Sequence, residues 1–236
     1  MDYMTLLKKL HVRYAHPGGK ELSEWIAVEA GATTETKLLD VGCGVGYSGA
    51  LWKALGANVW GIDRDKDMVA MARQVHKGMD VQVAGEDVLP FETDFFSHVL
   101  AESVLAFVPQ LDDLLQELHR VLKPGGALWC IELTLQDSLH TLSAEERSEL
   151  LAWYRFRRIW TNDEWTSAFA KAGFSAELQV TGTILDSFQW VNTDEEAPDV
   201  THLTTSERTL YEEHQRLTMQ YCTKIGYSVF CCKSNA

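Results

Sequence analysis

The 236-residue sequence has few cysteines and few basic residues, and it has no long hydrophobic run. No stretch approaches the roughly eighteen uncharged apolar residues of a transmembrane helix, so we expect no membrane partner. The first residues also lack the basic end and apolar stretch of a signal peptide, which predicts a cytoplasmic protein. The five cysteines form neither a CxxC pair nor a zinc-type pattern with histidine, so we expect reduced thiols and no metal site.

Positive charge is scarce along the chain. There are 21 Lys and Arg residues against 34 Asp and Glu residues, which gives a formal net charge of -13. Such a surface repels a phosphate polymer, and we therefore expect no nucleic-acid partner. The only dense basic stretch, residues 155–158, is expected to form the solvated face of a helix.

The first recognisable pattern is a strand, a glycine-rich loop, a helix and a second strand that ends in an acid. The apolar run 37–41 leads into Gly-Cys-Gly-Val-Gly at 42–46, and the apolar run 58–62 ends at Asp63. This order predicts the start of a doubly wound α/β sheet. A nicotinamide-binding fingerprint would need glycine at position 47, which is tyrosine here, so the loop does not fit a pyrophosphate under the helix.

Residues 39–46 resemble motif I of the class I S-adenosylmethionine-dependent methyltransferases, and later stretches fit the same family in order. These are Asp-x-Asp-x-x-Met from Asp63, Gly-Glu-Asp-Val-Leu-Pro-Phe at 85–91, the fourth strand at 95–105, and Lys-Pro-Gly-Gly at 123–126 before a fifth strand. The resemblance covers residues 36–134. It implies an α/β fold with a Rossmann-like, seven-stranded, mostly parallel sheet, an antiparallel last strand, helices on both faces and a helical cap.

The resemblance also implies S-adenosylmethionine as cofactor and S-adenosylhomocysteine as product. In the family pattern the glycines surround the methionine part, Asp63 holds the ribose, and Met68 covers one face of the adenine. Met68 fits the core face of its helix equally well. The 85–91 loop is one residue shorter than usual, so either Glu86 or Asp87 takes the acidic position beside the adenine. The implied cofactor contacts are Asp40, Gly42, Cys43, Gly44, Gly46, Asp63, Arg64, Met68, Glu86, Asp87, Val88 and Glu102.

Three residues are candidates for acceptor-side or catalytic groups, namely Tyr14, His16 and Glu102. In many small-molecule members of the family an N-terminal helix and loop fold over the cofactor, and residues 14–19 resemble that loop. Turn chemistry alone also explains this segment, and His16 would then be exposed. Glu102 follows the fourth strand, where it faces the ligand edge of the sheet or caps the next helix.

We expect a single methyltransferase domain with a core of residues 36–134, 162–186 and 224–234. The remaining segments, 1–30, 136–160 and 187–223, are expected to form a cap that opens for substrate exchange. A capping box at Ser143–Glu146 predicts a helix through Ile159. The cap aromatics, Trp153, Tyr154, Phe156, Trp160 and Trp190, either hold an amine by cation–π contact or pack the cap onto the core.

Methyl transfer from a sulfonium requires binding, alignment and exclusion of water more than a dedicated catalytic group. We therefore predict transfer to a small soluble acceptor. The alternatives are a protein or nucleic-acid methyltransferase and a non-catalytic S-adenosylmethionine-binding protein. The acceptor atom, the need for a general base and the oligomeric state are left open by the sequence.

Overall fold

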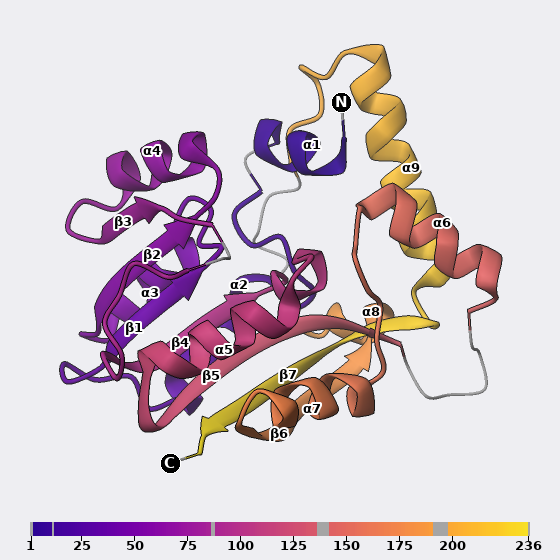
Figure 1. Ribbon diagram of the computed structural model, residues 1–236. Coiled ribbons are helices and arrows are strands. Elements are labelled where there is room, and N and C mark those ends of the chain that lie inside the picture. The colour runs from indigo at the N-terminus through magenta and orange to yellow at the C-terminus, as the bar shows by residue number, and fades with distance from the viewer. Residues whose placement is uncertain (1, 11, 86–87, 136–141, 191–197, 236) are drawn as a thin grey trace.

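A mostly parallel sheet forms the centre of the molecule (Figure 1). The computed structural model describes residues 2–10, 12–85, 88–135, 142–190 and 198–235. In this part of the chain seven strands have the order β3-β2-β1-β4-β5-β7-β6, and only β7 runs antiparallel to its neighbours. The predicted Rossmann-like fold is therefore confirmed. The strands are β1 (Lys37–Val41), β2 (Asn58–Asp63), β3 (Asp80–Val83), β4 (Phe96–Glu102), β5 (Leu122–Leu135), β6 (Phe174–Thr183) and β7 (Ile225–Ser234).

Helices cover both faces of this sheet. On one face α2 (Gly19–Glu29), α3 (Tyr47–Ala54) and α4 (Lys66–Val75) share a buried cluster with the strands. On the other face α5 (Leu111–Val121) and α7 (Asn162–Lys171) do the same. The leucines of α5 recur at helical spacing, and those that face the sheet are buried, as an amphipathic helix requires. No described helix has the length and apolar character needed to cross a bilayer.

The strand order places the ligand edge of the sheet beside β1. In the sheet β2 lies on one side of β1 and β4 lies on the other, so the carboxyl ends of these three strands border a crevice. Val41 at the end of β1 is level with Ile62 of β2 and Ala101 of β4. Asp63 and Glu102 each come one residue later, so both emerge at this edge.

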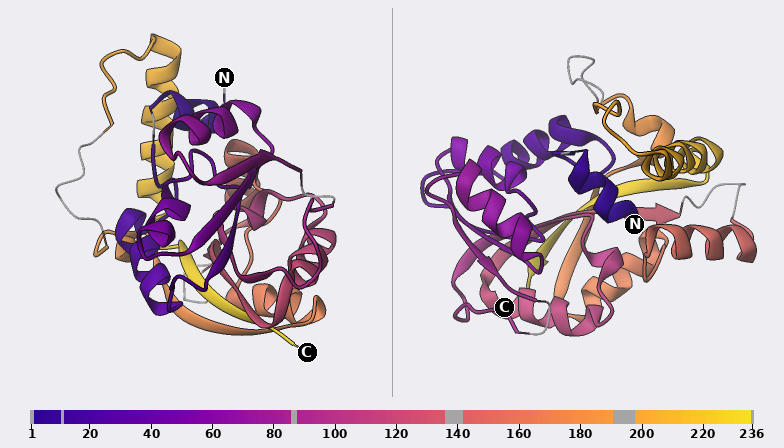
Figure 2. Two further views of the ribbon diagram at one scale, coloured as in Figure 1. Left: turned by 90° about the vertical axis from the view of Figure 1, so that its left-hand side faces the viewer. Right: turned by 90° about the horizontal axis from the view of Figure 1, so that it is seen from above.

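The cap stands beside this edge and consists of α1 (Tyr3–Lys9), α6 (Ala144–Tyr154) and α9 (Thr205–Tyr221), and the short α8 (Ile184–Ser187) packs on β6 and β7 at its base (Figures 1 and 2). It has small apolar clusters of its own, one around Leu150 and Leu217 and one around Leu6 and Leu203. The helix α2 differs from the predicted cap segment 1–30, because Leu22 and Ile26 are fully buried against the sheet.

The prediction of one helix through Ile159 is wrong. Helix α6 begins with the predicted capping box at Ser143 but ends at Tyr154, where Arg155 adopts a left-handed conformation. The basic stretch 155–158 is therefore not one face of a helix. The Arg158 guanidinium donates to the carbonyls of Leu105 and Val108 at 2.6 and 2.8 Å, so contacts to the core set the path of this segment.

Candidate active site

A cavity of about 900 Å³ lies between the carboxyl edge of the sheet and the cap. Its wall combines the glycine loop after β1, the ends of β2 and β4, and side chains from α1 and α9. This volume lies within the range of small-molecule binding sites. The cavity therefore joins the edge where open α/β sheets bind ligands to the helices of the cap.

The glycine loop presents backbone to the cavity. Gly42 and Gly44 have φ values of 66° and 53°, which side-chain-bearing residues rarely adopt. A Cβ on Gly42 would lie 2.6 Å from a Val104 methyl group, whereas a Cβ on Gly44 would meet no atom within 4 Å. The space beside Gly44 is thus open, and a ligand can approach the main chain closely there.

The Asp63 carboxylate organises two backbone segments at the same edge. One oxygen accepts the Gly44 N–H at 2.9 Å, and the other accepts the Asp65 N–H at 2.8 Å. Burial raises the pKa of Asp63 above its usual range, although the Gly44 bond opposes that shift. Asp40 accepts the Gly49 N–H at 3.1 Å, so it fixes the first turn of α3 behind the loop.

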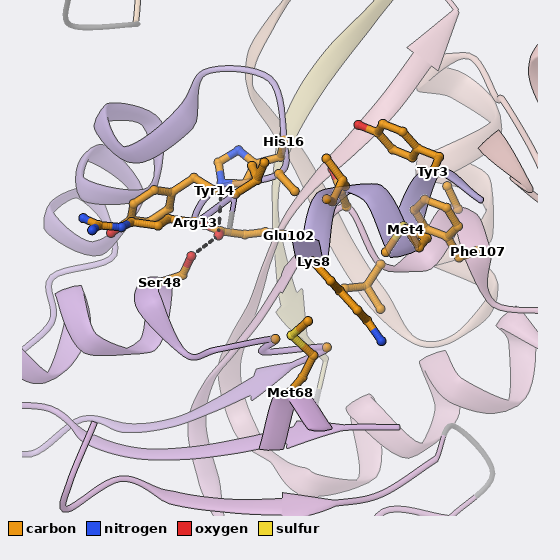
Figure 3. A pocket seen from close by; sticks show the side chains of 18 of the residues that line it. Tyr3, Met4, Lys8, Arg13, Tyr14, His16, Ser48, Met68, Glu102 and Phe107 are labelled. Atoms are coloured by element: carbon orange, nitrogen blue, oxygen red, sulfur yellow. Dashed lines mark hydrogen bonds and ion pairs between the residues drawn. The ribbon is translucent and has the colours of Figure 1, made fainter. Parts of the chain in front are cut away.

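His16 and Glu102 form a buried ion pair at the glycine-loop end of the cavity (Figure 3). Nε2 of His16 lies 3.2 Å from Oε2 of Glu102, and the two side chains are only 3% and 8% exposed. Ser48 donates to the same carboxylate oxygen, while the Ser23 hydroxyl lies 3.0 Å from Nε2. Nδ1 of His16 lies 3.1 Å from the Pro17 carbonyl oxygen, which accepts the ring proton.

The pair shifts both pKa values in the direction of an imidazolium facing a carboxylate. Burial alone would lower the pKa of His16, but the charge and hydrogen bond of Glu102 outweigh it, and the pKa is raised. Burial alone would raise the pKa of Glu102, but His16 and the serine hydroxyls outweigh it, and the pKa is lowered. The second carboxylate oxygen, Oε1, is buried and has no hydrogen-bond partner among the described residues, which is costly and unusual outside functional sites.

Two of the alternative expectations from the sequence are wrong. His16 is buried, although turn chemistry alone would have left it exposed. Glu102 does not cap the next helix, because Glu132 of β5 does so. Its carboxylate accepts the N–H groups of Val104, Leu105 and Ala106 at the start of η1 (Leu105–Phe107), at 3.2, 2.8 and 3.1 Å.

Glu132 is a site residue that sequence reasoning missed. It is fully buried, and burial raises its pKa to about 8 although its three backbone hydrogen bonds act in the opposite direction. The available signal was a single carboxylate within an otherwise apolar strand, residues 127–133. Its buried carboxylate fixes the backbone that follows β4, and this backbone forms part of the cavity wall.

Most of the predicted site residues line the cavity. Beside those already described, Tyr14, Cys43, Arg64 and Met68 contribute to its wall. The Tyr14 ring lies 6.4 Å from that of His16. The structure places Gly46 and Val88 outside the cavity wall, and Glu86 and Asp87 lie outside the described residues. Among the described residues no group of three or more histidine, cysteine or acidic side chains is placed to hold a metal ion.

Helix α1 connects the core to the rest of the cap through two adjacent lysines. Lys8 forms an ion pair with Asp65 at the start of α4, and Lys9 forms one with Glu207 of α9 at 2.7 Å. Tyr3 and Met4 on the same helix line the cavity (Figure 3). Sequence reasoning placed the segment in the cap but identified none of these contacts.

Comparison with known proteins identifies the family of this chain. Residues 39–130 match a family model described as a methyltransferase domain. An uncharacterised methyltransferase, YodH of Bacillus subtilis, is 32% identical over 176 residues, which cover 73% of this chain and 74% of that protein. A demethylmenaquinone methyltransferase of Oceanobacillus iheyensis is 36% identical over 123 residues, covering 48% of this chain and 49% of the relative.

Solved structures of this fold include bound methyl donors. Phosphoethanolamine N-methyltransferase 2 of Haemonchus contortus, in complex with S-adenosylmethionine, superposes with a TM-score of 0.79 at 19% identity, covering 99% of this chain and 57% of that one. At that identity the similarity concerns the fold. Together with the YodH alignment and the matched domain, it completes the assignment made from the sequence motifs: the chain belongs to the class I S-adenosylmethionine-dependent methyltransferases.

Proposed function

We propose that this enzyme transfers the methyl group of S-adenosylmethionine to a small-molecule acceptor held beneath the cap. The supporting observation is the composition of the cavity wall, in which the glycine loop and the helices α1, α8 and α9 border the same space. A donor at the loop and an acceptor beneath the cap would therefore share one cavity. Holding two reactants together in this way is the main requirement of the reaction.

The residues at the carboxyl edge fit the cofactor. The open space beside Gly44 can take the methionine part against the main chain, as a ligand that approaches backbone requires. Asp63 would accept hydrogen bonds from the ribose hydroxyls, with Arg64 beside it and Met68 against the adenine. When bound, the cofactor supplies an activated methyl group on a sulfonium. Asp40 and Cys43 complete the wall behind it.

We assign His16 and Glu102 a positioning role. Glu102 has a lowered pKa and His16 a raised one, so in this pairing the carboxylate is a weak base and the protonated imidazole has no free electron pair to accept a proton. The ion pair ties the segment after α1 to the end of β4, next to the glycine loop. This contact would hold Tyr14 at the cavity wall and exclude water from the cofactor end.

A small acceptor agrees with the charge and with the relatives. A formal net charge of -13 disfavours a nucleic-acid partner. The cap stands over the ligand edge, where a polypeptide substrate would need an open groove. The demethylmenaquinone methyltransferases among the relatives carry the name of a small-molecule acceptor, which supports the same class for this chain.

The test is incubation with labelled S-adenosylmethionine and a fractionated metabolite pool, followed by mass spectrometry. We expect label in one small-molecule fraction. Asp63→Ala serves as the matched variant, and it should reduce incorporation in that same fraction. Label that appears only in polypeptide or nucleic acid would contradict the proposed acceptor class. Binding of the cofactor without transfer to any fraction would favour a non-catalytic role.

A further inference from the structure

The cavity has two chemically different ends. Most of its charged residues lie around the glycine loop, whereas the cap side is built mainly from aliphatic and aromatic side chains. Those contributed by the cap helices and by η1 and its flanks include Met4, Leu7, Phe107, Tyr154, Phe188 and Met219. A surface of this kind gains free energy by removing an apolar molecule from water.

The ionisable groups on the cap side are already neutral or paired. Among the described lining residues from α1, β5, α6, α8, α9 and the segment between β4 and α5, these groups are Lys8, Glu132, His214 and tyrosine hydroxyls. Lys8 pairs with Asp65, and Glu132 is engaged by three backbone N–H groups. Burial lowers the pKa of His214 to about 4, so its ring is neutral at physiological pH.

The aromatic residues of α1, α6 and α9 pack on one another. The ring of Tyr3 lies 4.9 Å from Tyr154 and 4.8 Å from His214, and Trp153 stacks on His214 at 6.0 Å. The Tyr154 hydroxyl is 2.9 Å from Nδ1 of His214. A bound ammonium group would find no uncommitted carboxylate among the described cap-side residues, and burying a charge without a partner is costly.

Apolar side chains also form part of the solvent-facing rim of this end. Met4, Phe188 and Met219 are 41%, 53% and 64% exposed, and all three line the cavity. Large apolar side chains that are exposed around a cavity are typical of ligand-binding grooves. They provide an apolar path from solvent to the cap side of the cavity.

We propose that the acceptor is an uncharged molecule with a largely apolar body, bound between α1, η1, α8 and α9. This inference rests on the proposed function and narrows its substrate class. An organic cation and an organic anion are the competing classes, because the described lining side chains of α1, η1, α8 and α9 offer neither of them a free counter-charge.

Binding of matched probes tests the inference without requiring turnover. The protein is saturated with S-adenosylhomocysteine and titrated by calorimetry with 2-naphthol, 2-naphthoate or 2-naphthylmethylammonium, which share a ring system and differ in charge. We expect 2-naphthol to bind about tenfold more tightly than either charged probe. Phe188→Asp should weaken 2-naphthol binding about tenfold, because it places a charge on the apolar rim.

Leu185→Asp is the matched control, since Leu185 is 51% exposed on α8, which ends beside Phe188, but does not line the cavity. It should change 2-naphthol binding less than about twofold, and neither variant should alter binding of S-adenosylhomocysteine. Equal or tighter binding of a charged probe, no binding of any probe, or equal effects of the two variants would overturn the inference. Methyl transfer to a charged metabolite would overturn this substrate class alone, whereas probe binding without any transfer would overturn the proposed function alone.

Discussion

Asp63 supports the glycine loop and also lines the cavity in which we propose the cofactor binds, so a substitution there has two expected effects. Asp63→Ala should weaken S-adenosylmethionine binding by roughly 1.5–3 kcal/mol, the range for losing a hydrogen-bonding partner that carries a charge. The loss of its bonds to Gly44 and Asp65 should also lower the melting temperature. Calorimetry measures the affinity, and thermal unfolding measures the second effect.

Asp67→Ala provides a control for that measurement, because Asp67 is exposed in the same region and does not line the cavity. It should leave cofactor affinity within about 0.5 kcal/mol of the wild type. An unchanged affinity in a folded Asp63→Ala protein would remove Asp63 from the cofactor site.

The ion pair of His16 and Glu102 makes stability depend on pH. Folding raises the pKa of His16, so its stabilising contribution is full below about 6.5 and declines as the pH rises through the folded-state value. Folding lowers the pKa of Glu102, so its contribution is full above about 4.5 and declines as the pH falls through the folded-state value. The pair is therefore most stabilising between these limits.

His16→Gln tests this dependence through urea unfolding at pH 6 and pH 9. The difference in unfolding free energy between wild type and variant should be larger at pH 6, where the imidazolium is present. The control is His202→Gln, which alters a histidine that is 45% exposed and should give a small difference at both pH values. An equal difference for His16→Gln at both pH values would mean that the ring acts as a neutral hydrogen-bonding group.

Within the loop between β1 and α3, two glycines with similar φ values should respond differently to substitution. Gly42→Ala combines left-handed strain with a contact 2.6 Å from Val104, so it should destabilise the fold by more than the roughly 1–2 kcal/mol of strain alone. Gly44→Ala meets no neighbour within 4 Å and should cost only that strain while still reducing cofactor affinity. Denaturant unfolding and calorimetry separate the two outcomes. Equal destabilisation by both substitutions would contradict the steric argument.

Elements with a local signal were predictable from the sequence. The glycine loop, the leucine stripe of α5 and the capping box at Ser143 each depend on neighbours a few residues away. The end of α6 was not predictable, because it depends on Arg158 reaching carbonyls that lie about fifty residues earlier in the chain. The role of Glu132 was not predictable either, because the three backbone N–H groups that donate to it lie 26–28 residues earlier in the chain.

The molecule as a whole consists of a large core and a cap with small apolar clusters. The two clusters in the cap are built from few buried side chains, whereas each face of the sheet buries a much larger set. Amides of α1 and α9 should therefore exchange hydrogen faster than those of β1 and β4 in the ligand-free protein. S-adenosylhomocysteine alone should slow exchange in the glycine loop, and addition of 2-naphthol should be needed to slow it in the cap.

Exchange in the cap as slow as in the central strands, without any ligand, would show that the cap is a permanent part of the core. In that case the idea of a cap that opens for substrate exchange would be abandoned. Lys9→Gln tests how much one ion pair slows hydrogen exchange in the cap. It removes the ion pair between α1 and Glu207 of α9 while leaving the apolar contacts of α1 in place.

The placement of the two ends of the chain has a practical consequence for handling the protein. Tyr3 and Met4 line the cavity, whereas β7 ends at Ser234, on the opposite side of the molecule (Figure 1). A fusion partner or affinity tag joined ahead of α1 would lie close to this cavity. Attachment after β7 keeps a fusion partner away from the cavity, so immobilisation and reporter fusions belong at that end of the chain.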